Sequence, residues 1–198
     1  MALDGKSKIL DAARAVIGRN GIAGATVRVI AEEAGLSTGA IYHYYSSKEE
    51  ILYDIMETNL SESTKIAAAS KQGTYSVEQI LDLILENVRK RFDMEEESRI
   101  KFYLAEEAMI GNEELSAKFK QKYQEWITGT EELLHYIYGS PTEEKEILRV
   151  RAIASLLIAC IDGTVQQLML NANISSKDEL HEIYCDIMRK ALPAFLKM

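Results

Sequence analysis

Residues 26–48 read TVRVIAEEAGLSTGAIYHYYSSK, and this stretch decides how the rest of the chain is interpreted. It predicts two short helices joined by a tight turn. Thr26 is a good N-cap because its hydroxyl can accept a hydrogen bond from a free backbone N–H, and apolar residues then recur at helical spacing. Gly35 ends this first helix, since glycine adopts the left-handed conformation without strain. Ser37 then caps a second helix from about Thr38 to Tyr44.

Two helices around such a turn form a helix-turn-helix, which places its second helix in the major groove of DNA. Short hydroxyl residues and Gly39 on the outer face of that helix let the backbone approach base edges. Tyrosine and histidine there can contact phosphates or thymine methyl groups. Lys48 at the start of the next helix could hold a phosphate. A Gly-Leu-Ser turn with core aromatics also occurs in ordinary helical proteins, so the turn alone leaves both interpretations open.

The wider pattern resembles the DNA-binding domain of TetR-family transcriptional regulators. The matching pieces between Ile9 and Leu52 are Ile9–Ala13, Gly21, Thr26, Ile30-Ala31, Ala34–Ser37, Gly39, Ile41-Tyr42, Tyr44-Tyr45 and Ser47–Glu49. The resemblance implies that Tyr45 is a buried aromatic residue. It also implies a set of DNA-contact positions, which are Thr26, Arg28, Ser37, Thr38, Gly39, Tyr42, His43, Tyr44 and Lys48. Many relatives carry His in place of Tyr44 and Lys or Arg in place of Ser46, so the target sequence stays open.

Composition favours an all-α protein, because Val/Ile/Thr runs with strand periodicity are missing and only 2 Pro occur in 198 residues. Apolar spacing predicts about nine helices. The expected organisation is a three-helix DNA-binding domain over residues 1–48 and a helical regulatory and dimerisation domain over 49–198. We expect one long helix that starts after Ser47, continues to about Ser70 and joins the two parts.

Charge and cysteine content narrow the class of function. The formal net charge of -8 weighs against a general nucleic-acid binder. Cys160 and Cys185 lie in apolar helical contexts, and we expect buried reduced thiols. The polar N-terminus lacks a secretory signal, and the longest apolar run, 152–161, is too short to span a membrane. These features predict a soluble cytoplasmic protein without membrane association.

The helix expected after Thr142 is apolar on more than one face, which is typical of a buried helix or an interface. With the last helix it could form a four-helix bundle with a second chain. A two-fold dimer also fits DNA half-sites one helical turn apart, and the resemblance implies the same homodimer. The expected interface residues are Leu157, Ile161, Val165, Leu168, Ile183, Tyr184, Ile187 and Met188.

The resemblance further implies a small-molecule pocket among the middle helices. Its candidate lining comprises Phe92, Phe102, Tyr103, Glu106, Met109, Phe119, Tyr123 and Trp126, residues that any helical core would also contain. Asp162 lies within an apolar stretch, with Gln166 one turn on. A buried carboxylate needs a partner, so Asp162 either bonds to a neighbouring helix or the second chain, or it contacts a ligand together with Gln166.

These patterns predict a DNA-binding transcriptional regulator, a dimeric repressor on a pseudo-palindromic operator that a small apolar or amphipathic effector releases. The alternative is an architectural or cell-cycle DNA-binding protein that answers to a protein partner and has no ligand. An enzyme is not expected, because the sequence carries no nucleophile–base pair, phosphate loop or metal-ligand spacing. No cofactor or metal is predicted.

Overall fold

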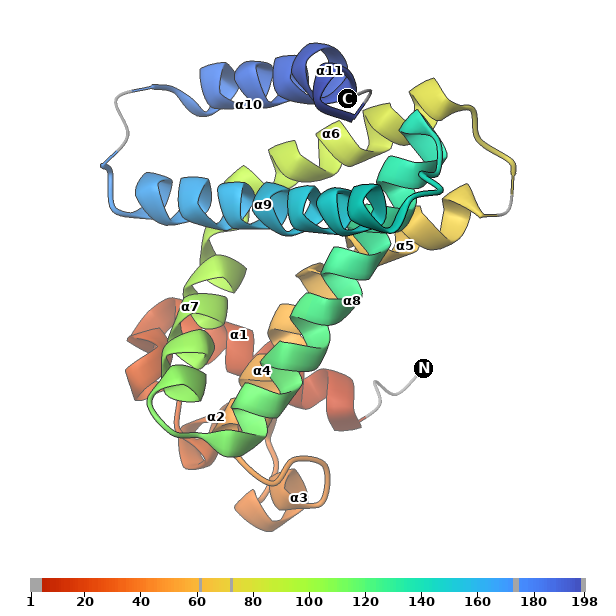
Figure 1. Cartoon of the computed structure of the whole chain (residues 1–198). Coiled ribbons are helices and arrows are strands. Elements are labelled where there is room, and N and C mark those ends of the chain that lie inside the picture. The colour runs from red at the N-terminus through yellow and green to blue at the C-terminus, as the bar shows by residue number, and fades with distance from the viewer. Residues whose placement is uncertain (1–4, 61, 72, 173–174, 197–198) are drawn as a thin grey trace. The chain divides into compact units, whose positions relative to one another are not determined.

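The computed structural model describes residues 5–60, 62–71, 73–172 and 175–196, and helices are the regular elements over these ranges. The all-α expectation is confirmed (Figure 1). The elements are α1 (Gly5–Gly24), α2 (Val27–Ala34), α3 (Thr38–Tyr42), α4 (Lys48–Leu60), α5 (Glu62–Ser70), α6 (Val77–Asp93), α7 (Glu95–Met109), α8 (Glu113–Tyr138), α9 (Glu144–Met169), α10 (Lys177–Asp186), the π-helical turn η1 (Ile187–Ala191) and α11 (Leu192–Leu196).

Two of the nine expected helices are divided. The helix expected from Ser47 to Ser70 is described as α4 and α5, and residue 61 between them lies outside the described residues. The last helix is interrupted by η1, where Leu192 donates its N–H to the carbonyl of Ile187. Pro193 follows directly, and proline has no N–H to continue an α-helical ladder. Its ring also crowds the carbonyl four residues earlier, in η1, which favours a wider turn at that place.

The chain divides into two compact units, one of Met1–Leu60 with Glu96–Ser116 and the other of Ser61–Glu95 with Ala117–Met198. The sequence boundary expected after residue 48 stays a prediction. In the first unit, α1 packs on α2 and α4, and α3 packs on α2. The core of this unit is aliphatic, because α1, α2, α3 and α4 each turn fully buried side chains inward. These include Ile9, Val16, Ile30, Ile41, Ile51 and Leu52.

Gly21 interrupts α1 with φ +71°, a conformation that a residue with a Cβ rarely adopts. The sequence predicted a helix end at this glycine. The structure has a kink there, and one further helical turn leads to Gly24 before α2 begins.

In the second unit, α6 contacts α5, α9 and α10. One core cluster joins Ile66 and Ala67 of α5 to Ile80 of α6 and Leu133 of α8. Ser76 is the N-cap of α6 and Ser176 is the N-cap of α10, each with a complete capping box.

Over the described residues, no helix is both long and apolar enough to cross a membrane. The expectation of buried thiols is wrong for Cys160, which is exposed, and Cys185 is half-buried.

Candidate DNA-binding and regulatory sites

The turn between α2 and α3 has the geometry that its sequence predicts. Thr26 is the N-cap of α2, and its hydroxyl accepts a hydrogen bond from the N–H of Val29 at 3.3 Å. Gly35 ends the helix in the left-handed conformation, with φ 66° and ψ 33°. Ser37 caps α3 by accepting from the N–H of Ala40 at 3.1 Å. The left-handed Gly35 and the Ser37 cap define the turn that leads from α2 into α3.

The outer side of α3 is exposed to solvent. Ile41 is fully buried and holds the helix to the core, whereas Thr38 and Gly39 are exposed. Tyr42 is 57% exposed and Tyr44 is 44% exposed, a high fraction for large aromatic side chains. His43 and Tyr44 meet edge to face, with ring centroids 5.3 Å apart. The structure thus brings the expected contact residues of the second helix onto one accessible surface.

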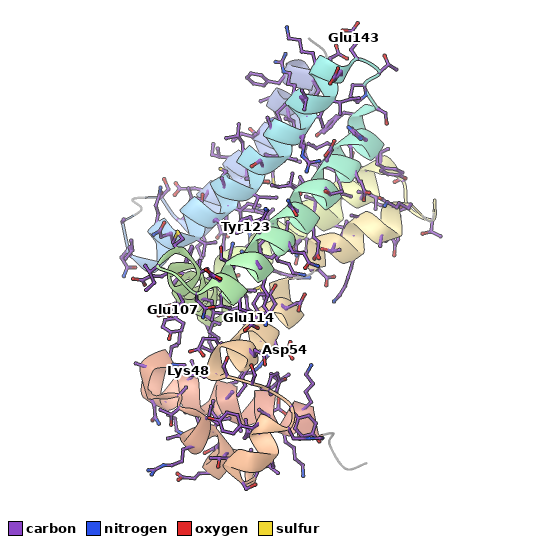
Figure 2. All side chains as sticks on the ribbon, turned by 60° about the horizontal axis from the view of Figure 1, so that its bottom comes forward. Lys48, Asp54, Glu107, Glu114, Tyr123 and Glu143 are labelled. Carbon is purple, nitrogen blue, oxygen red and sulfur yellow. The ribbon has the colours of Figure 1, made fainter. Side chains whose placement is uncertain are left out.

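Tyr45 behaves differently from the tyrosine before it, because it is buried and bonded. Its hydroxyl donates to Oδ2 of Asp54 on α4 at 2.8 Å. Lys6 on α1 approaches the same oxygen to 2.7 Å and lies 5.5 Å from the centre of the Tyr45 ring. Figure 2 labels Asp54 on α4, two turns beyond Lys48. These contacts join α1, α4 and the segment after α3.

The two cationic residues that flank the turn, Arg28 and Lys48, differ in exposure and in their contacts with the rest of the protein. Arg28 is strongly exposed and faces Glu32, one turn away, at 3.5 Å. Lys48 is half-buried, and its ammonium donates to the carbonyl oxygen of Ile22 at 3.4 Å. The same ammonium lies 5.2 Å from the centre of the Tyr103 ring on α7. Arg28 therefore presents a solvated charge, whereas the charge of Lys48 is held at the base of α4.

The second unit contains a polar contact inside an otherwise apolar region. Tyr123 on α8 donates its hydroxyl to Oδ2 of Asp162 on α9 at 2.8 Å, and Arg91 on α6 approaches the other carboxylate oxygen to 3.4 Å. All three side chains are largely buried, and Figure 2 shows Tyr123 projecting from α8. Burial first, and then the neighbouring Asp162 carboxylate, raise the pKa of the Tyr123 hydroxyl well above its ordinary value. The expectation that Asp162 bonds to a neighbouring helix is confirmed.

This contact lies at one wall of a groove between α8 and α9, with a volume of about 370 Å³. Aliphatic side chains, the Tyr123 ring and a few polar groups form its surface, a mixture typical of small-molecule sites. The lining residues are Tyr123, Ile127, Ser155, Ile158, Ala159, Asp162, Gly163 and Gln166. Three of the expected ligand residues, Tyr123, Asp162 and Gln166, are thus brought together.

The remaining ligand candidates are distributed over both units. Phe119 and Trp126 are buried on either side of Tyr123, with ring centroids 6.4 Å and 5.3 Å from the Tyr123 ring. Phe92 is buried in α6. Four further candidates belong to α7 in the first unit, where Phe102 and Tyr103 are half-buried and Glu106 and Met109 are exposed.

The expected dimer residues divide into an inner and an outer group. Val165, Tyr184 and Met188 are buried within their own unit, and Tyr138 donates to the carbonyl of Met188 at 2.5 Å. Leu157, Ile161 and Leu168 are half-buried, whereas Ile183 and Ile187 are exposed.

The most exposed large apolar residue of α9 is Leu156, at 68%, and the sequence pattern did not single it out. Leu148, Ala152, Leu156 and Cys160 are all exposed and recur every four residues, so they form one stripe, called here the α9 stripe.

Comparison with known proteins agrees with this geometry. Residues 9–55 match the profile of the bacterial regulatory proteins of the tetR family. The HTH-type transcriptional regulator PksA of Bacillus subtilis is 27% identical over 90% of this chain and 85% of its own. The fatty acid metabolism regulator protein of the same organism is 26% identical over 83% of both chains. The solved structure of the fatty acid degradation regulator FadR from Bacillus halodurans has a TM-score of 0.68 at 19% identity, and the similarity covers 94% of this chain and 95% of that one.

Regulators of this kind work by binding DNA rather than by catalysis. The family match covers the helix-turn-helix and the first two turns of α4, and the relatives extend the likeness over most of the chain. The capped turn, the exposed outer side of α3 and these similarities lead to one conclusion: residues 9–55 form a DNA-binding domain of the tetR family, and the chain is similar over most of its length to helix-turn-helix transcriptional regulators.

Proposed function

We propose that this regulator binds a pseudo-palindromic operator as a homodimer, represses transcription there, and is released by an apolar or amphipathic small molecule. The observation that carries the DNA part is the exposure of Tyr42 and Tyr44 beside the capped start of α3. Neighbouring exposed apolar or aromatic side chains on one surface commonly mark an interaction site. The proposed contacts are Thr26, Arg28, Ser37, Thr38, Gly39, Tyr42, His43, Tyr44 and Lys48.

Dimerisation is supported by the α9 stripe together with two exposed residues, Ile183 on α10 and Ile187 at the start of η1. An exposed apolar patch of this kind favours association. Ile183 and Ile187 keep the role expected from the sequence, and Leu156 takes the central place on α9. A two-fold axis would present two copies of α3 to two half-sites, which a pseudo-palindrome requires.

The groove between α8 and α9 supports the small-molecule part. Its volume of about 370 Å³ falls within the range of drug-sized pockets. Its walls combine the aliphatic Ile127, Ile158 and Ala159 with polar groups from Tyr123, Ser155, Asp162 and Gln166. Because two similar proteins are named as regulators of fatty acid metabolism or degradation, fatty acids and their thioesters are the first ligands to test. The proposed effector is therefore an acyl chain with a polar head.

Selection of bound duplexes from a random DNA pool tests the DNA part. The protein, refolded away from any carried ligand, is expected to enrich a pseudo-palindrome, and Tyr42→Ala should weaken binding to it about tenfold or more, the loss of one good contact. Thr64→Ala is the matched control, since Thr64 is an exposed α5 residue in the second unit. No enriched sequence from folded, dimeric protein would contradict the proposal.

The ligand part is tested by titrating operator complexes with palmitate, oleate and their coenzyme A thioesters. One of these should release DNA, and Gln166→Leu should raise the concentration needed. Gln124→Leu on the exposed side of α8 is the control, because Gln124 does not line the groove. Tight acyl binding without any change in operator affinity would contradict the effector role.

A further inference from the structure

The first turn of α1 lies directly against the segment that follows α3. Gly5 is the first residue of α1, and the Tyr44 hydroxyl occupies the space next to it. A methyl group at position 5 would stand 2.6 Å from the hydroxyl oxygen of Tyr44 and 2.9 Å from its ring carbon Cζ. Both distances are shorter than van der Waals contact, so only glycine leaves the Tyr44 ring where it is.

The next residue of α1 engages the next tyrosine. Lys6 is ion-paired with Asp54 at 2.7 Å and lies over the Tyr45 ring, whose hydroxyl bonds to the same carboxylate. Two consecutive residues of α1 thus contact two consecutive residues after α3. Tyr45 is buried and fixes the backbone, whereas Tyr44 is partly exposed and its ring direction depends on the space at Gly5.

We propose that Gly5 is a positioning residue for DNA reading, because it sets the direction of the Tyr44 ring without touching DNA. The inference rests on the proposed contact role of Tyr44. His43 is included in the effect, since its ring packs edge to face on Tyr44. The first turn of α1 therefore orients the two aromatic side chains at the end of α3.

Moving the Tyr44 ring should lower operator affinity but leave the folding stability unchanged. Tyr44 is 44% exposed, and the atoms nearest to Gly5 are at the far end of its side chain. Rotation of Tyr44 away from a new methyl group would leave the core formed by Ile9, Ile41 and Tyr45 in place. A substitution at position 5 should then separate operator affinity from stability, which a purely structural residue would not do.

The test is a double-mutant cycle on operator affinity in the full-length protein, with Gly5→Ala, Tyr44→Ala and both together. We expect Gly5→Ala to weaken operator binding about fivefold to tenfold, with thermal stability no lower than that of the wild type. Tyr44→Ala should weaken binding about tenfold or more. In the Tyr44→Ala background, Gly5→Ala should change affinity by less than about twofold.

Gly18→Ala is the matched control on the same helix. A methyl group at Gly18 would meet nothing within 4 Å, so operator affinity should stay at the wild-type value. Full affinity of Gly5→Ala beside a weakened Tyr44→Ala protein would overturn the positioning role alone. An equal loss from Gly5→Ala in both backgrounds would overturn it as well. An unchanged Tyr44→Ala protein would instead remove Tyr44 from the proposed contact set, and the inference with it.

Discussion

The ammonium of Lys48 lies 5.2 Å from the centre of the Tyr103 ring while it donates to the carbonyl oxygen of Ile22. One side chain thereby joins the start of α4 to α7 and to the segment between the Gly21 kink and α2. An ammonium over an aromatic ring is attracted by about 0.5–1 kcal/mol at exposed sites and by more where water is excluded. The half-buried Lys48 is thus held in place before any phosphate arrives.

Loss of the aromatic ring should loosen this arrangement without removing a DNA contact. We expect Tyr103→Leu to weaken operator binding about twofold to fivefold, which corresponds to the loss of one cation–π contact. The measurement is fluorescence anisotropy with a labelled operator. Tyr103→Phe keeps the ring face and should bind like the wild type. Equal weakening by the Leu and Phe substitutions would show that the ring face is not what holds Lys48.

The charge of Lys48 has a separate signature in the salt dependence of binding. The logarithm of the operator association constant falls linearly with the logarithm of salt concentration. If Lys48 neutralises a phosphate in the complex, Lys48→Gln should make this negative slope shallower by about 0.9. Lys65→Gln is the control, because Lys65 lies in the second unit and pairs with Glu62 one turn away. An unchanged slope together with weakened binding would restrict Lys48 to an internal anchor.

Dimerisation is expected to depend on Leu156. Leu156→Glu places a charge in the middle of the α9 stripe, so we expect a monomer in light-scattering chromatography and a large loss of operator affinity. Ile110→Glu is the control for an exposed apolar residue, since Ile110 is 72% exposed and lies in the first unit. A dimer that survives Leu156→Glu unchanged would place the interface elsewhere.

Removing either partner of the Tyr123–Asp162 hydrogen bond should lower the free energy of unfolding, and the loss should be larger for Asp162. Tyr123→Phe removes one hydroxyl and should cost about 1 kcal/mol of unfolding free energy. Asp162→Ala removes the carboxylate that faces Arg91 within a largely buried pair and should cost about 3 kcal/mol. Urea unfolding of both variants gives the comparison. A larger loss for the Phe variant would contradict the assignment of Asp162 as the central group.

Glu125 should make stability depend on pH in the acid range. Hydrogen bonds from Lys122 and Gln121 lower the pKa of this carboxyl below its ordinary value. The charged form therefore stabilises the fold at neutral pH, and this contribution is lost as pH falls through the lowered pKa. Glu125→Gln should be less stable than the wild type at pH 7 by under about 1 kcal/mol, since the side chain is partly exposed, and this difference should shrink as pH falls through the lowered pKa.

Thermal unfolding from pH 3 to pH 7 measures this difference. Glu143→Gln serves as the control, because Glu143 precedes α9 without a capping hydrogen bond from its side chain (Figure 2). A gap between Glu125→Gln and the wild type that stays constant down to pH 3 would contradict the role of the charge.

Local chemistry made the DNA-binding end predictable from sequence. The hydroxyls of Thr26 and Ser37 and the left-handed Gly35 act within one turn of their own positions, and each has the role that its residue type indicates. Lys48 was foreseen as a cation near DNA but not as a partner of Tyr103, because that contact joins residues far apart in the chain.

The face of α9 was harder to predict for a different reason. A helix that is apolar all round has the same periodicity whichever side meets its own chain. The pattern therefore predicts Val165 at the interface, although Val165 is buried within its own unit, and it does not single out Leu156, which is exposed. The groove beside Asp162 depends on packing between α8 and α9, which no single stretch of sequence encodes.

The α9 stripe contains an exposed cysteine, Cys160, whose thiol is a reactive group. Cys160 stands one helical turn from Leu156, so the face proposed to pair carries a natural thiol. In a dimer built on that face, alkylation of Cys160 would proceed only as fast as the subunits come apart. The rate of subunit exchange could thus be measured on the natural sequence, without an engineered cysteine. Comparing the alkylation rate of Cys160 with and without operator would show whether DNA slows that exchange.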